Sequence, residues 1–135
     1  MRPQDAIRDV LRKRKEVVLA YLYGSSVKGY ARSDSDLDLG ILLDERFDAD
    51  PLYPARIAIE IETQTHINRE LDVSLLNGMP PRFLRQVIDG ELVFAKDESD
   101  RVKFETEVID SYLDFKPFYD QYDRVRRERL LSGAG

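Results

Sequence analysis

The sequence contains no cysteine and no tryptophan, and it has one histidine among its 135 residues. Without cysteine the chain can form neither disulfide bonds nor thiolate metal sites, which excludes a small disulfide-stabilised secreted fold. The N-terminal segment is charged throughout and lacks the apolar centre of a secretory signal. No apolar run approaches the roughly 20 residues that cross a bilayer. We therefore expect a cytoplasmic protein without a membrane partner.

Basic residues are fewer than acidic ones, with 21 Lys and Arg against 26 Asp and Glu and a net charge of −5. Proteins that bind nucleic acid through a broad surface need basic residues to neutralise phosphates, so no stable nucleic-acid binding is expected. A single nucleotide is still compatible with this charge, because a few basic residues and metal ions suffice for one triphosphate. The length favours a single domain over residues 1–135.

Segments typical of helices and strands follow one another along the chain in the order helix, strand, strand, helix, strand, helix, strand, helix. Short runs that are apolar throughout or alternate in polarity predict strands, at residues 17–24, 36–43, 70–77 and 91–95. Apolar residues spaced three or four apart predict helices, at residues 3–15, 52–67 and 81–89. Within 52–67, Ile57, Ile59 and Ile61 also fit the alternation of a strand, but the length of the segment and its Ala and Glu residues favour a helix.

The C-terminal stretch from about 98 to 131 lacks glycine and contains one proline, which predicts one long helix or two helices joined near Pro117. Apolar and aromatic residues recur on this stretch at helical spacing, at Val108, Tyr112, Phe115, Tyr119 and Tyr122. The favoured interpretation is that this stripe packs on the sheet. The alternative is that it forms an interface with a partner protein.

Three aspartates form the candidate catalytic and metal site. Asp36 and Asp38 lie two residues apart on a strand, so their carboxylates leave the same face with α-carbons about 6.5 to 7 Å apart. Asp72, on a later strand, reaches the same place if its strand lies beside 36–43. Clustered carboxylates repel one another by about 4 kcal/mol per close pair at an effective dielectric constant near 20, which a divalent cation relieves.

This arrangement favours magnesium-dependent phosphoryl transfer. Mg²⁺ prefers oxygen ligands and is usually held by one or two carboxylates together with substrate phosphates. Two such ions about 3.5 to 4 Å apart can activate an attacking oxygen and stabilise the leaving group. An Asp-x-Asp pair alone is weak evidence, because such pairs are also common at helix caps and in solvated turns.

Four residues around the first strand are candidates for nucleotide binding. Gly24 lets a phosphate approach the backbone closely, and Ser25 adds a hydroxyl donor at the end of the strand. Lys28 and Arg32 follow in the connecting loop and suit the remaining charge of a triphosphate. The same residues also fit an ordinary turn followed by solvated surface charge.

The combined pattern resembles the signature of the DNA polymerase β-type nucleotidyltransferase superfamily. It consists of Gly24-Ser25, ten further residues, and an Asp-Leu-Asp triplet that begins at Asp36. The segment GSSVKGYARSDSDLDLGILL looks like the minimal, MNT-type members, such as the MntA antitoxins. The resemblance spans roughly residues 17–95, the expected catalytic core. It implies the α/β (α+β) polymerase β-like nucleotidyltransferase fold, a mixed sheet of about four strands flanked by helices, with a long C-terminal helical segment outside the core.

The resemblance also implies roles for the candidate residues. Asp36 and Asp38 would bind two Mg²⁺ ions, and Asp72 would complete the metal site and deprotonate the acceptor hydroxyl, with ATP as the common substrate of the family. Minimal members of this type are often antitoxins that transfer AMP to a tyrosine of a partner HEPN-domain ribonuclease toxin. The implied function is therefore a protein adenylyltransferase that acts as the antitoxin of a toxin–antitoxin pair.

Two alternative functions stay open. The first is an aminoglycoside-type nucleotidyltransferase that modifies a small molecule, although such enzymes usually carry an added substrate domain where this chain has only a helical stretch. The second is a non-catalytic antitoxin that acts by occlusion. Retention of three carboxylates argues against the second function, because an unused acidic cluster destabilises the folded chain.

Overall fold

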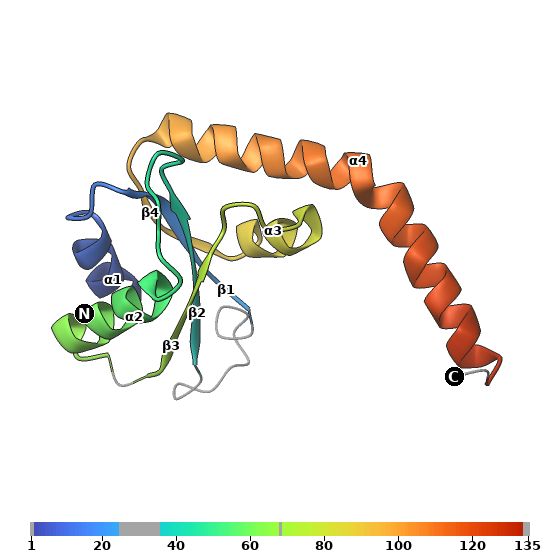
Figure 1. The fold of residues 1–135 in the computed structure, drawn as a ribbon, viewed down its shortest axis with the longest axis horizontal. Helices are drawn as coiled ribbons and strands as arrows, with labels where there is room; N and C mark the ends of the chain where they lie inside the picture. The colour runs from blue at the N-terminus through green and yellow to red at the C-terminus, as the bar shows by residue number, and fades with distance from the viewer. Residues whose placement is uncertain (1, 25–35, 68, 134–135) are drawn as a thin grey trace.

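The computed structural model describes residues 2–24, 36–67 and 69–133. Helices and strands follow one another there in the order that the sequence predicts (Figure 1). Their bounds are α1 Pro3–Leu11, β1 Val17–Tyr23, β2 Leu37–Leu43, α2 Tyr53–Thr65, β3 Leu71–Leu75, α3 Pro81–Ile88, β4 Glu91–Ala95 and α4 Glu98–Leu131.

The four strands form one mixed sheet in the order β3-β2-β1-β4. Strand β1 pairs antiparallel with β2 and β4, whereas β2 and β3 are parallel. The predicted mixed sheet of four strands is therefore confirmed. As an inner strand covered on both faces, β1 is apolar almost throughout, and Leu19, Ala20 and Tyr21 are all buried.

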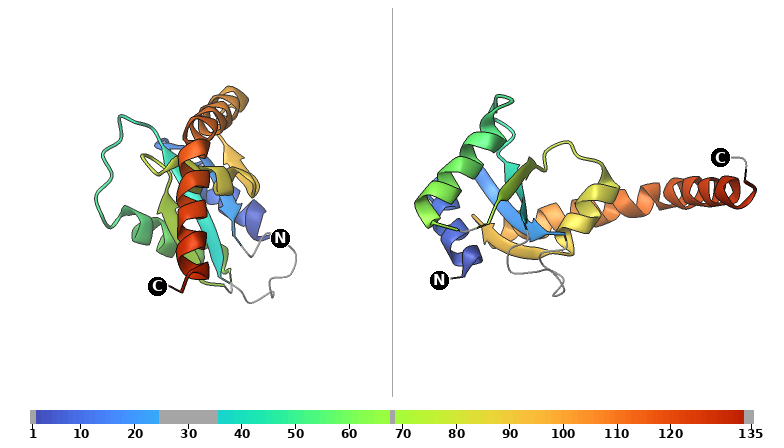
Figure 2. Two further views of the ribbon diagram at one scale, coloured as in Figure 1. Left: turned by 90° about the vertical axis from the view of Figure 1, so that its right-hand side faces the viewer. Right: turned by 90° about the horizontal axis from the view of Figure 1, so that it is seen from below.

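Helices cover both faces of the sheet (Figure 2). Helices α1 and α2 lie on one face, and α3 and the first turns of α4 lie on the other. Because successive strand residues point to opposite faces, Leu22 joins the core under α1 and α2, and Tyr21 joins the core under α3 and α4. Helices thus cover an apolar cluster on each face of the sheet. At the start of β2 and β3, polar residues take the place of apolar ones.

Proline marks the first turn of three helices, with Pro3 in α1, Pro54 in α2 and Pro81 in α3. Proline suits this place because its fixed φ matches a helix and the first N–H groups have no partner within the helix. Helix α2 is followed by His66, which has a φ of 53° in the left-handed region. His66 is therefore a capping residue.

Helix α4 is one long helix that runs past the sheet (Figure 1). Only Phe104 and Val108 of this helix are buried. The favoured expectation that the aromatic stripe packs on the sheet is wrong beyond Val108, since Phe115 and Tyr122 are exposed. The physical reason is length: 34 residues extend about 50 Å, whereas a five-residue strand such as β4 extends about 17 Å.

We call residues 109–131 of α4 the C-terminal arm. The helix bends near its middle (Figure 1), and Pro117 lies inside it, where proline removes one backbone hydrogen bond. Arg82 of α3 connects to the arm, where it contacts both the Tyr119 ring, at 5.1 Å from the ring centre, and Asp123. No helix in the described part of the chain combines the length and apolar character needed to cross a membrane.

Candidate active site

The predicted aspartates meet at the start of the parallel strand pair. In the register of β2 and β3, Asp38 lies directly opposite Asp72. Neighbouring strands are about 4.8 Å apart, so the two side chains leave the same face of the sheet as direct neighbours. The condition on which the prediction for Asp72 depended, that its strand lies beside the strand of Asp38, is therefore met.

Asp36 lies just before β2, at the same end of the sheet. The N–H of Leu37 donates to the carbonyl of Glu70 at 2.9 Å, which fixes the starts of β2 and β3 side by side. Asp36 and Asp72 are exposed, and Asp38 is half-buried between them. The backbone therefore gathers three carboxylate-bearing positions with different access to solvent.

The surroundings of Asp38 disfavour the ionised form of its carboxyl group. Burial raises the pKa of the Asp38 carboxyl, and the negative charges of Asp72 and Asp36 raise it further. The influence of both neighbours on one carboxyl shows that the three groups share an electrostatic environment. A cation bound among them would remove this repulsion.

Gly24 makes room for the Asp38 carboxylate. Its φ of 84° is in the left-handed region, and a Cβ atom added there would lie 2.7 Å from Oδ2 of Asp38. A larger residue at position 24 would strain the backbone and displace the carboxylate. The glycine is therefore required for the shape of the site, in addition to the phosphate contact that the sequence predicts. Ser25, Lys28 and Arg32, the other predicted nucleotide-binding residues, lie outside the described residues.

Tyr23 and Ser74 belong to the same polar corner and were not assigned a role from the sequence. Tyr23 is opposite Asp38 in the β1–β2 register, and its hydroxyl is hydrogen-bonded with Ser74. Burial raises the pKa of Tyr23, as do the charges of Asp38 and Asp72, while the Ser74 hydrogen bond lowers it. The alternation of strand residues could have found Ser74, because it follows Asp72 by two positions and shares its face.

The oxygen ligands of this corner fit Mg²⁺, which prefers carboxylates that also leave room for substrate phosphates. Among the described residues, no three acidic or histidine side chains already converge closely enough to hold a metal ion. Asp36, Asp38 and Asp72 are the residues that could close around a metal ion together with substrate phosphates.

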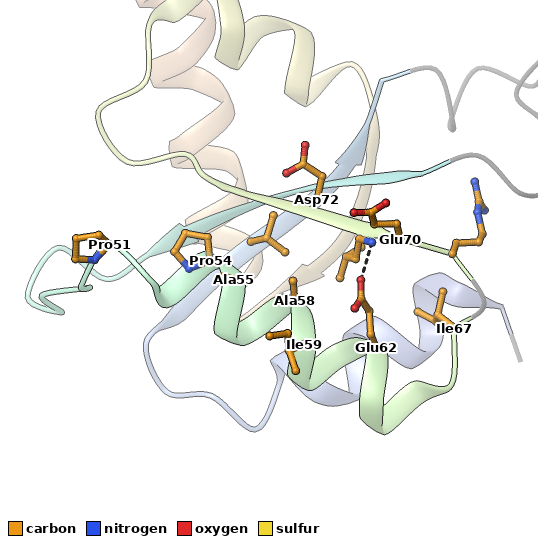
Figure 3. Close-up of a pocket in the computed structure, with 12 residues that line it drawn as sticks. Pro51, Pro54, Ala55, Ala58, Ile59, Glu62, Ile67, Glu70 and Asp72 are labelled. Atoms are coloured by element: carbon orange, nitrogen blue, oxygen red, sulfur yellow. Dashed lines mark hydrogen bonds between the residues drawn. The ribbon is translucent and has the colours of Figure 1, made fainter.

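A groove of about 870 Å³ lies between α2 and β3, beside this corner (Figure 3). We call it the β3 groove. Asp72 lines it, and its side chain stands on the side of β3 away from α2 (Figure 3). The residues of α2 and the preceding turn that line it are mostly apolar or small, namely Pro51, Pro54, Ala55, Ala58, Ile59 and Glu62.

The chain matches the family model described as polymerase beta, nucleotidyltransferase, over residues 5–99. This match covers more than half of the chain, and the chain therefore belongs to the polymerase beta nucleotidyltransferase family. The fold, the register of the aspartates and the family agree with one another. No curated relative matches the sequence.

Several solved structures share the fold over nearly the whole chain. A chain of a toxin–antitoxin complex with AMP-PNP is 19% identical, covers 97% of each chain and has a TM-score of 0.66. A chain from the complex of tri-AMPylated Shewanella oneidensis HEPN toxin with MNT antitoxin is 19% identical, covers 98% of this chain and 95% of that chain, and has a TM-score of 0.63. A chain of an MntA–HepT complex is 17% identical over 98% and 96%, with a TM-score of 0.61.

Proposed function

We propose that this chain is a metal-dependent adenylyltransferase that transfers AMP from ATP to a tyrosine hydroxyl of a partner HEPN-domain ribonuclease toxin. In this role it would act in the cytoplasm as the antitoxin of a toxin–antitoxin pair. The observation that carries the proposal is the pairing of Asp38 with Asp72 across β2 and β3, with Asp36 at the same end of the sheet. Family membership supports the reaction class.

In the proposed mechanism, Asp36, Asp38 and Asp72 hold Mg²⁺. Bound there, the ions would offset the charge of the triphosphate and favour attack on the α-phosphorus. Asp72 is more exposed to solvent than Asp38, with which it is paired, and it accepts the proton of the acceptor hydroxyl. The acceptor oxygen forms a bond to the α-phosphorus, and the bond from this phosphorus to the bridging oxygen breaks, so pyrophosphate leaves.

A protein acceptor is favoured by the C-terminal arm. Phe115, Phe118 and Tyr122 lie close together on one side of α4 and are exposed. Exposed aromatic side chains in such a group are typical of protein–protein interfaces. Similar structures include a tri-AMPylated HEPN toxin in complex with an MNT antitoxin.

The decisive experiment is co-expression with the protein encoded by the neighbouring gene, which the proposal expects to be a HEPN-domain toxin, followed by incubation with Mg²⁺ and ATP labelled on the α-phosphate. We expect label on the partner protein, and mass spectrometry should locate it on tyrosine. Asp38→Asn should abolish labelling. Asp48→Asn, at an exposed aspartate of the β2–α2 loop, is the matched control and should label normally.

The alternatives give different outcomes in the same experiment. If Asp38→Asn neutralises the partner as well as the wild-type chain does, and neither chain labels it, the antitoxin acts by occlusion. If label appears only on small molecules, the chain is a small-molecule nucleotidyltransferase. If Mg²⁺ and ATP together leave the melting temperature unchanged at saturation, the chain has no nucleotide site, because a ligand that binds only the folded state must raise it.

A further inference from the structure

Strand β3 is the terminal strand of the sheet, and no other strand of the described residues pairs with its outer edge. The Leu37 N–H donates to the Glu70 carbonyl, and the Leu76 N–H donates to the Ile41 carbonyl, both at 2.9 Å. Even-numbered residues of β3 therefore direct their backbone groups towards β2. In a strand, the backbone groups of the intervening residues point the other way.

The N–H of Leu71 shows that the backbone groups of the odd-numbered residues of β3 point away from β2. This N–H donates to Oε1 of Glu62 at 2.8 Å, on the side of β3 that faces away from β2 (Figure 3). Val73 and Leu75 have the same parity, so their N–H and carbonyl groups point to the open edge. The Glu62 contact limits the available edge to the two or three residues that follow Leu71.

The open edge adjoins the β3 groove, and Asp72 borders both. The floor of the groove contains the small residues Ala55 and Ala58 and the exposed Ile59, all from α2 (Figure 3). Of the three site aspartates, Asp72 lines the groove, whereas Asp36 and Asp38 do not. The groove is thus the part of the described surface that connects an unpaired strand edge with the carboxylate assigned to the acceptor hydroxyl.

We propose that an extended segment of the acceptor protein pairs with the open edge of β3 and lies in the β3 groove. This inference rests on the proposed function and adds to it the class of segment that is recognised. Strand residues alternate between faces. If one acceptor side chain lies beside Asp72, its two neighbours in sequence point towards α2, over Ala58 and Ile59.

The geometry fits the tyrosine acceptor of the proposed function and indicates what its neighbours should be. Two strand spacings place the backbone of the added segment about 10 Å from the backbone of Asp38. A tyrosine carries its hydroxyl at the far end of an aromatic ring and can cross over Asp72 towards Asp38, whereas serine and threonine carry theirs next to the backbone. We expect a tyrosine flanked on both sides by apolar residues, because these side chains contact the apolar floor of the groove.

Ile59→Asp tests the groove. Ile59 is 61% exposed, so the substitution should leave folding intact, but it places a charge where the apolar neighbours of the tyrosine should lie. We expect kcat/KM for partner labelling to fall at least tenfold, with ATP binding unchanged. Val102→Asp is the matched control, since Val102 is an apolar residue of α4 with 49% exposure and does not line the groove. It should label as the wild-type chain does.

Val73→Pro tests the edge. Proline removes the outward N–H and is tolerated on edge strands whose N–H faces away from the sheet. We expect slower labelling than in Val73→Ala, which keeps the N–H and loses only side-chain contact. Equal labelling by Ile59→Asp and the wild-type chain would overturn the proposal, as would a wild-type dimer that Val73→Pro dissociates, because the edge would then serve self-association.

Amide hydrogen exchange separates this proposal from the proposed function. When the partner binds, the Val73 N–H should exchange more slowly than in the free chain, whether or not AMP is transferred. Protection of Val73 without labelling would support edge pairing and contradict the adenylyltransferase. Labelling without protection of Val73 would support the adenylyltransferase and contradict edge pairing. Absence of both binding and labelling would contradict both.

Discussion

At the scale of single residues, Asp38 occupies an environment that is poor for stability and suited to binding a cation. It is half-buried, and two further aspartates raise its pKa beyond the effect of burial. The folded chain therefore holds the ionised Asp38 less favourably than the unfolded chain does. Such local cost is common at functional sites, where groups are arranged for a ligand and not for the ligand-free fold.

Asp38→Asn should separate activity from stability. We expect AMP transfer to fall by about 100-fold or more, because a metal ligand contributes several kcal/mol to transition-state stabilisation. The melting temperature without Mg²⁺ should stay the same or rise, since a neutral amide removes the repulsion from Asp36 and Asp72. Calorimetry with and without Mg²⁺ checks this, and a large loss of stability in the variant would contradict the electrostatic argument.

Gly24→Ala should reduce activity through displacement of Asp38. Forcing alanine into a φ of 84° costs about 1–2 kcal/mol of folding free energy, and the added Cβ would lie 2.7 Å from the Asp38 carboxylate. Gly78→Ala is the matched control, because Gly78 has a φ of 74° with no atom within 4 Å of an added Cβ. Both variants should lose similar stability in urea denaturation, but only Gly24→Ala should lose AMP transfer at least tenfold.

Strand alternation in the sequence was sufficient to predict part of the site. It placed Asp36 and Asp38 on one face and identified Asp72 as a candidate third carboxylate. It could not establish that β3 lies beside β2, because pairing between strands separated by a helix depends on contacts distant in the sequence. Tyr23 was missed for a related reason, since its part in the site depends on the antiparallel register that places it opposite Asp38.

At the scale of secondary-structure elements, Glu16 connects the start of β1 with α2. The Tyr53 hydroxyl donates to Oε2 of Glu16 at 2.8 Å, and the Arg14 guanidinium donates to the same oxygen at 3.0 Å. Burial alone would raise the pKa of Glu16, but a backbone hydrogen bond and the contacts with Tyr53 and Arg14 outweigh burial and lower it. The ionised carboxylate therefore stabilises the packing of these elements.

This contact predicts a dependence of stability on pH. Because the Glu16 pKa is lower in the folded chain, its contribution is complete above the unfolded pKa of about 4.3 and is lost as the pH falls through the folded pKa. Glu16→Gln should weaken this dependence and lower the unfolding free energy at neutral pH by about 1 kcal/mol. Urea denaturation from neutral to acidic pH measures both effects, and Glu45→Gln, on an exposed loop, should change neither.

Phe118→Asp should weaken partner binding without destabilising the isolated chain. Phe118 is 67% exposed, so its replacement removes little core packing, whereas exposed aromatic residues often dominate interface energetics. We expect a loss of affinity of about tenfold or more, measured by calorimetry with the purified partner. Leu113→Asp is the control, because Leu113 is five residues away and about 140° around the helix. Equal binding by Phe118→Asp and the wild-type chain would exclude the exposed group of Phe115, Phe118 and Tyr122 as a docking surface.

The arm also shows the limit of helical periodicity. Spacing of three and four residues correctly indicates that Val108, Phe115 and Tyr122 lie on related sides of one helix. Periodicity does not reveal whether another element covers that side. Of these three residues, Val108 alone reaches the core between the sheet and α4, because the helix is longer than the sheet. The prediction that the aromatic stripe packs on the sheet is therefore wrong beyond the end of the sheet.

At the scale of the whole molecule, the described chain has a compact part and an extended part. The sheet and its covering helices carry the aspartates, and the C-terminal arm extends away from the sheet (Figure 1). The starts of β2 and β3 and the end of the arm all lie on the lower side of the molecule in that view.

If the partner binds the bent arm as proposed, the arm would also act as a tether. A partner held by Phe115, Phe118 and Tyr122 would present its tyrosine to Asp72 at an effective concentration that short tethers raise to the millimolar range. A free peptide would have to reach that concentration in solution to react as fast. The substrate would then be defined by the distance of its tyrosine from the docked surface as well as by the apolar neighbours of that tyrosine. Mutations in the partner that shift this distance should block modification even when the sequence around the tyrosine is unchanged.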